Sequence, residues 1–163
     1  MKQVQSPLLD KATLGRSTAP LDLVVPFTVP RLTEIALRAA HRLGAGLDAA
    51  VRLVKVQVVP FPLDLRFSPV PVDFLEEQLR SLCGEGDSVE IRLAREFEEG
   101  LRGALRYRSM VVLATNKRPW RTRTERLAES LRKAGYTVVM VPENGAGDAL
   151  AAPVTAHKEY QHA

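Results

Sequence analysis

The residues of this chain best suited to chemistry lie just after residues 113 to 116, in the stretch LATNKRPWRTRTERLAESLRKAGYTVVMVP. Guanidinium and ammonium groups bind phosphate and carboxylate, and an indole ring stacks on flat ligands. The relevant side chains are those of Lys117, Arg118, Trp120, Arg121 and Arg123. Their types predict anion binding by a loop that joins a buried strand to an amphipathic helix.

The positive charge of the chain is concentrated in and after this loop. The formal net charge is +4, and residues 117–133 hold seven Lys or Arg against two Glu, so the rest sums to about −1 (+4 minus +5). Such a segment suits a phosphate, a nucleic acid or an anionic surface. A solvated helix face beside a basic loop gives the same pattern. Nucleic acid is the least expected partner, because the loop has one aromatic residue and no recognised motif.

Neither a catalytic residue nor a metal site is expected. The histidines His41, His157 and His162, with Cys83, lack the spacing of zinc ligands. Neither Ser109 nor Cys83 has a general base that can be recognised from spacing. We therefore expect a protein that is not an enzyme.

The length and composition fit one globular domain with two tails. The chain has 163 residues, 45% of them hydrophobic, and one cysteine, which cannot form an intramolecular disulfide. No apolar run approaches the roughly 20 residues that a membrane helix needs, and residues 1–20 do not resemble a signal peptide. The expected organisation is a tail (1–20), a domain (21–143) and a second tail (144–163), in the cytoplasm and without a membrane partner.

Apolar runs and helical periodicity alternate along the domain. The pattern predicts strands over 21–27, 51–60, 88–95, 109–115 and 136–142, and helices over 30–45, 72–83 and 97–108. A fourth helix begins with a capping box, Thr122 and Glu125, and ends at Gly135. Strands that alternate with helices pair in parallel through right-handed crossovers. Charges alternate along 88–95, which favours an edge position for that strand.

From about Leu21 to Glu143 the chain resembles the universal stress protein family. The resemblance rests on the segments LVVPFT, ALRAAHRLGAGL, VQVVP and SMVVLAT…RLAESLRKAGYTVVMVP. It implies an α/β fold: an open, Rossmann-like, five-stranded parallel sheet ordered 3-2-1-4-5, with helices on both faces, as in adenine nucleotide alpha hydrolase-like proteins. It also implies a homodimer through the final strand, 136–142, which lacks the charges that usually protect an edge.

The nucleotide-binding signature of the family is missing. ATP-binding members carry glycine, two residues, glycine, nine residues, then glycine with Ser or Thr after the fourth strand. Those positions fall on Ala114, Lys117, Thr124 and Glu125, and the spacing is three residues too short. The acidic residue at the end of the first strand is also absent, since the turn reads Pro26, Phe27 and Thr28. The resemblance therefore implies a stress-response regulatory module without ATP or another cofactor.

Other readings stay open. The degenerate site, or the basic loop 117–123, fits a nucleotide or another anionic small molecule, held by some of Thr28, Val59, Thr115, Asn116, Lys117, Arg118, Arg121 and Arg123. Val59 matches the strand-two ending whose backbone lies near the base in ATP-binding relatives. Lys55 and Gln57 share one face of a strand expected to be buried. They indicate either an incompletely covered sheet face or the lining of a polar cavity.

Overall fold

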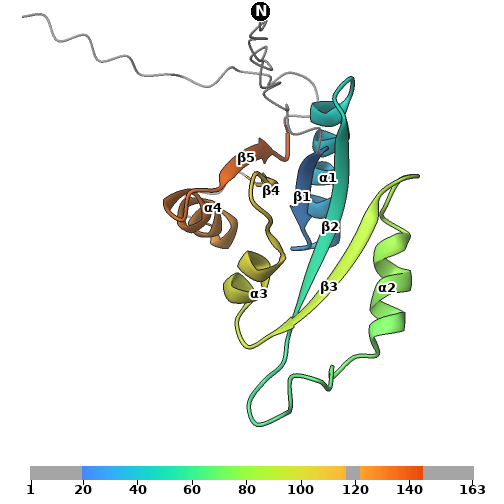
Figure 1. Ribbon diagram of the computed structural model, residues 1–163, viewed down its shortest axis with the longest axis vertical. Coiled ribbons are helices and arrows are strands. Elements are labelled where there is room, and N and C mark those ends of the chain that lie inside the picture. Colours follow the sequence, from blue (N-terminus) through green and yellow to red (C-terminus); the bar gives the residue numbers. More distant parts are fainter. Residues whose placement is uncertain (1–19, 117–121, 145–163) are drawn as a thin grey trace, which may run out of the picture.

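Five parallel strands alternate with four helices in the computed structural model, which describes residues 20–116 and 122–144. The strands are β1 (Leu21–Pro26), β2 (Ala49–Val58), β3 (Ser88–Ala94), β4 (Met110–Thr115) and β5 (Thr137–Pro142). The helices are α1 (Pro30–Gly44), α2 (Val72–Arg80), α3 (Phe97–Ala104) and α4 (Arg123–Lys133). The sheet order is β3-β2-β1-β4-β5 with every pair parallel, as predicted (Figure 1).

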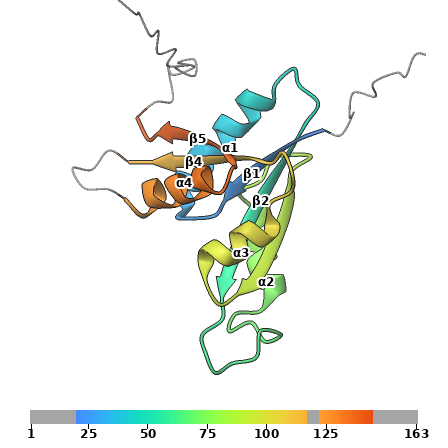
Figure 2. The same cartoon turned by 60° about the vertical axis from the view of Figure 1, so that its left-hand side comes forward.

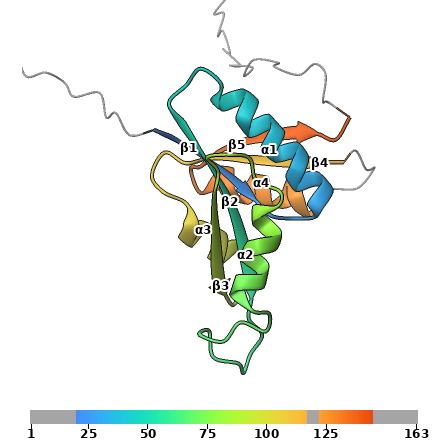
Figure 3. The same ribbon diagram turned by 90° about the vertical axis from the view of Figure 1, so that its right-hand side faces the viewer.

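The sheet is the middle layer of three. Helices α1 and α2 cover one face and α3 and α4 cover the other, which is clearest when α1 and α2 face the viewer (Figure 3). Successive strand residues point to opposite faces. Leu23 and Val25 therefore pack under α1, while Val24 packs toward α3 and α4. This period explains why most positions of the inner strands are apolar.

The ends of the last helix follow the sequence signals. The Thr122 hydroxyl accepts a hydrogen bond from the Glu125 backbone N–H at 3.2 Å. At the other end, the N–H groups of Gly135 and Tyr136 donate to the carbonyls of Arg132 and Leu131, both at 3.0 Å. Gly135 has φ 90°, a left-handed conformation that suits glycine. The capping box and the glycine stop are both confirmed.

The third helix is shorter than predicted. It ends at Ala104 rather than at 108, because Leu105 is extended and a tight turn follows over 106–109. The Ser109 N–H donates to the Arg106 carbonyl at 3.0 Å, and the Arg106 N–H donates to Ser109 Oγ at 2.9 Å. A serine side chain that accepts a backbone N–H offers an alternative to the next helical turn. The predicted end at 108 is therefore wrong.

The connection from β2 to α2 projects away from the rest of the fold (Figure 2). Of the ten exposed large hydrophobic side chains among the described residues, seven lie between 58 and 74. They are Val58, Phe61, Leu63, Leu65, Phe67, Val72 and Phe74. We call this segment the apolar loop. An apolar cluster of this kind on the surface is typical of a contact site.

Candidate functional site

Ligands of open parallel sheets bind where the strands end, beside helix N-termini. In this chain Thr28 follows β1, Val59 follows β2, and Thr115 with Asn116 ends β4. Because β1 lies between β2 and β4, the structure brings these predicted residues to one edge of the sheet. Arg123 lies exposed in the first turn of α4, whereas Lys117, Arg118 and Arg121 fall outside the described residues.

The N-terminus of α4, where a phosphate would bind, holds a carboxylate of the chain itself. The Glu125 Oε2 accepts a hydrogen bond from the Thr122 N–H at 2.8 Å, while the Glu125 N–H is taken by the Thr122 hydroxyl. The Thr122 hydroxyl also lies 3.5 Å from that of Thr115. Free N–H groups and positive potential make a helix N-terminus an anion site. Here two N–H groups are occupied and a negative charge stands beside them.

The end of β1 is also closed by internal hydrogen bonds. The Thr28 N–H donates to Thr33 Oγ at 3.2 Å, and the Thr33 hydroxyl donates to the Val29 carbonyl at 2.9 Å. After β5, the Glu143 N–H donates to the Thr115 carbonyl at 2.8 Å and its carboxylate pairs with Arg31 at 2.8 Å. Glu143 thus adds to this edge a second carboxylate, whose charge is paired with that of Arg31.

Val59 has both of its backbone groups occupied. Its side chain is fully buried, its N–H donates to the Ala94 carbonyl at 2.9 Å, and its carbonyl accepts from Arg95 at 3.0 Å. In ATP-binding members of the family that the sequence resembles, the corresponding backbone lies near the adenine base. Here it continues the sheet toward β3 and is covered by a guanidinium group.

Lys55 and Gln57 have separate surroundings. The Lys55 ammonium lies 4.2 Å from the centre of the Phe27 ring, a cation–π contact at the end of β1. Partial burial lowers the pKa of Lys55. Gln57 is partly buried and donates to the adjacent Val58 carbonyl at 3.5 Å. The aromatic contact gives Lys55 a structural role on a half-buried strand.

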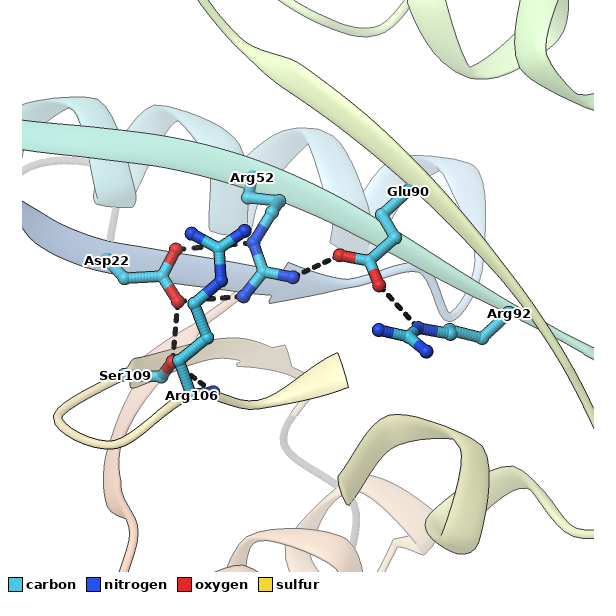
Figure 4. A network of polar contacts seen from close by, with 6 residues as sticks. All are labelled: Asp22, Arg52, Glu90, Arg92, Arg106 and Ser109. Carbon is cyan, nitrogen blue, oxygen red and sulfur yellow. Dashed lines mark hydrogen bonds and ion pairs between the residues drawn. The ribbon is translucent and has the colours of Figure 1, made fainter. Parts of the chain in front are cut away.

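A polar network that the sequence pattern did not predict lies on the other face of the sheet (Figure 4). At its centre is Arg52, 5% exposed on β2. Its guanidinium donates two hydrogen bonds to Asp22 of β1, at 3.2 and 2.7 Å, and a third to Glu90 of β3. Glu90 also accepts from Arg92, and Ser109 donates to Asp22 at 2.5 Å. The network therefore joins β1, β2 and β3 to Ser109, the residue that precedes β4.

Both carboxylates of this network stay ionised. Burial alone would raise the pKa of Asp22, but hydrogen bonds from Arg52 and Ser109, with the charges of Arg52 and Arg106, lower it below its usual value. For Glu90 the hydrogen bonds from Arg92 and Arg52 outweigh burial in the same way, and its pKa is lowered. Against the cost of its burial, the two carboxylates raise the pKa of Arg52. Every charge has a partner, which is the arrangement of a structural network.

Two further side chains that could do chemistry, those of His41 and Cys83, are paired or unreactive. His41 on α1 lies exposed and contacts the buried Asp87 carboxylate at 2.8 Å. Burial and the Asp87 charge raise the pKa of the Cys83 thiol against the opposing charge of Arg80, so the reactive thiolate is disfavoured. Within 20–116 and 122–144, no group of three or more metal-ligating side chains is present.

No helix in the described part of the chain is long and apolar enough to cross a membrane. No protein-family model matches the sequence, and no curated protein matches it. Among solved structures, the chain is similar to the crystal structure of a macrolide-efflux protein from Streptococcus pneumoniae, at 16% identity and a TM-score of 0.41. The match covers 76% of this chain and 46% of that chain, so this chain spans about half the length of its neighbour. A likeness this distant carries no argument about function.

Proposed function

We propose that this protein is a non-enzymatic regulatory module of the universal stress protein type, cytoplasmic and dimeric, which does not bind ATP. The observation that carries the proposal is the Glu125 carboxylate at the N-terminus of α4. A phosphate placed there would meet a negative charge and compete with an existing capping box. The strand order agrees with the family, although the family itself rests on the resemblance.

Two further features support the same proposal. The Thr28 N–H and both backbone groups of Val59 are engaged within the chain, so the edge offers little for an adenosine to contact. The apolar loop, with Phe61 86% and Phe67 69% exposed, suits a protein that acts by contact rather than by catalysis. The free thiol of Cys83 is in keeping with a reducing compartment.

The proposal predicts no saturable ATP binding. We expect isothermal titration with ATP and Mg²⁺ at about 150 mM salt to show no binding at low-micromolar concentration. Exposed Lys and Arg contribute little to affinity without a preformed cradle, and salt screens that contribution. Replacing Glu125 with Gln removes the negative charge but keeps the geometry of the capping box. Comparing this variant with the unaltered chain tests whether the charge alone excludes ATP.

Saturable, micromolar ATP binding to the unaltered chain would contradict the proposal. It would favour the alternative, a binding domain for a nucleotide or another anionic small molecule that uses the basic loop 117–123. Arg123, exposed beside the loop, is the described residue that supports this alternative. Replacing Arg123 with Gln would then weaken the binding, whereas it changes nothing if the site is absent.

The dimer is proposed through β5, which is the edge strand opposite β3. Between Thr137 and Pro142 the strand has no charged residue, and Val139, Met140 and Val141 are half-buried. The β3 edge, by contrast, carries Glu90 and Arg92, which discourage strand pairing. An unprotected apolar edge favours pairing with a second copy through a two-fold axis.

This assignment predicts a dimer at micromolar protein concentration. Sedimentation velocity should give twice the monomer mass of 18.0 kDa. Replacing Val139 with Lys should shift the protein to monomer, because the charge lies at the centre of the proposed edge. The matched control is Val89 to Lys on β3, which should leave the dimer intact. A monomeric unaltered chain would refute the assignment.

A further inference from the structure

A groove of about 550 Å³ lies where β4 and β5 begin. The candidate site described above lies at the other end of the strands, where they finish. One wall is residues 105–109, which precede β4, and the other is residues 134–137, where α4 gives way to β5. The two walls are adjacent because the strands that follow them are paired, with Met110 beside Thr137. The volume falls in the range of small-molecule sites, roughly 300–1,000 Å³.

The groove is lined by cations and aromatic rings. It contains Arg106, Tyr107 and Arg108 on one wall and Tyr136 on the other, and none of the described residues that line it is acidic. Arg108 is exposed and has no ion-pair partner among the described residues. A planar guanidinium matches the oxygens of a phosphate or carboxylate, and tyrosine rings contact flat apolar groups.

Arg106 belongs both to the wall of the groove and to the surroundings of the polar network. Arg106 reaches from residues 105–109 toward the Asp22 carboxylate, whose pKa its charge helps to lower (Figure 4). The guanidinium groups of Arg52 and Arg92 are balanced by the carboxylates of Asp22 and Glu90, so the positive charge of Arg106 is left in excess at the groove. Ser109, fixed by its bond to Asp22, ties this network to the wall of the groove.

Arg108 is held in an unfavourable backbone conformation. It occupies the third position of the turn closed by the Ser109 N–H and the Arg106 carbonyl, and its φ is 74°. Glycine or asparagine is favoured at a turn position with positive φ, and a longer side chain there is strained. Residues kept in such conformations cluster at binding and active sites. The turn presents the Arg108 guanidinium at a cost in stability that a glycine would avoid.

We propose that this groove binds a small organic oxyanion, either a phosphate monoester or an ionised carboxylic acid, that carries a flat apolar group. Arg108 binds the oxyanion, with the positive potential of Arg106 behind it, and Tyr136 with Tyr107 contacts the flat group. The opposite end of the sheet takes no part. The groove is therefore separate from the N-terminus of α4. Its binding of an oxyanion does not depend on whether ATP binds at that N-terminus.

The test is a two-dimensional amide NMR titration of the full chain with phenyl phosphate. We expect saturable shifts at residues 105–109 and 134–137, with Kd at or below about 1 mM. Inorganic phosphate, which lacks the ring, and phenol, which lacks the charge, should each bind more weakly. Arg108 to Gln should weaken phenyl phosphate about tenfold, whereas Arg38 to Gln, an exposed arginine on α1, should leave it unchanged.

The Arg108 to Gly variant provides a second measurement, which distinguishes loss of binding from loss of folding. The backbone strain is relieved, so the thermal midpoint should hold or rise while phenyl phosphate binding falls. Absence of saturable shifts would overturn the proposal. So would binding that Arg108 to Gln leaves unchanged, or shifts confined to residues 113–125, which would assign the anion to the basic loop.

Discussion

Replacing Arg52 with Ala should lower the free energy of unfolding by about 3 kcal/mol at pH 7. The substitution leaves Asp22 and Glu90, 13% and 23% exposed, without the cation that both contact. Removing one member of a buried charge network costs far more than the network contributes over apolar packing, because the remaining charges stay desolvated. Urea unfolding followed by circular dichroism measures the change.

The pH dependence of this loss identifies its cause. The lowered pKa values of Asp22 and Glu90 in the folded chain stabilise it above the ordinary carboxyl pKa of about 4, and this contribution disappears as the pH falls through the lowered values. In the Arg52 to Ala variant fewer hydrogen bonds and charges oppose the burial of Asp22 and Glu90, so we expect their pKa values to rise. The difference between the two proteins should therefore shrink as the pH falls to about 4 and below, through the lowered pKa values.

Arg92 supplies the matched control for Arg52. It contacts the same Glu90 carboxylate, but its side chain is 48% exposed on the edge strand. Exposed ion pairs contribute between zero and about 1 kcal/mol. Arg92 to Ala should therefore cost less than about 1 kcal/mol. An equal loss for both variants, or an Arg52 deficit that grows at low pH, would mean that burial of the network is not what matters.

Replacing Gly100 with Ala should destabilise the fold, even though alanine favours helices. A Cβ at Gly100 would lie 2.6 Å from Val56 Cγ1 and 2.8 Å from Ala94 Cβ, distances that neither short side chain can relieve by turning away. Overpacking a core costs about 1–3 kcal/mol, against a gain of up to about 1 kcal/mol in helix propensity. We expect a net loss of about 1 kcal/mol or more.

Replacing Gly103, in the same helix, with Ala measures the gain in helix propensity without any packing cost. A Cβ there meets nothing within 4 Å, so Gly103 to Ala should raise the free energy of unfolding by up to about 1 kcal/mol. Chemical denaturation of both variants should place them on opposite sides of the unaltered chain. If Gly100 to Ala is as stable as Gly103 to Ala, then α3 does not pack against β2 and β3 as closely as the distances state.

The sequence determined the elements and their order because those signals are local. Apolar runs, Gly135 and the capping box of Thr122 and Glu125 each act within a few residues of themselves, and parallel pairing follows from the alternation of strand and helix. The same local rule failed at the end of α3. There Ser109 closes a turn with Arg106, and a helical pattern read along the chain cannot weigh that competition.

Only the tertiary structure decided which polar residues meet. Lys55 and Gln57 are polar residues in a strand expected to be buried, and Arg52 is a third, on the opposite face of the same strand. An arginine in a central strand requires a carboxylate partner, and the sheet order shows where to look: Asp22 on one neighbouring strand and Glu90 on the other. Neither their distances from Arg52 nor the groove before β4 and β5 can be read from spacing. These contacts join residues that lie 30 or more positions apart in the chain, and the packing of strands and loops alone brings them together.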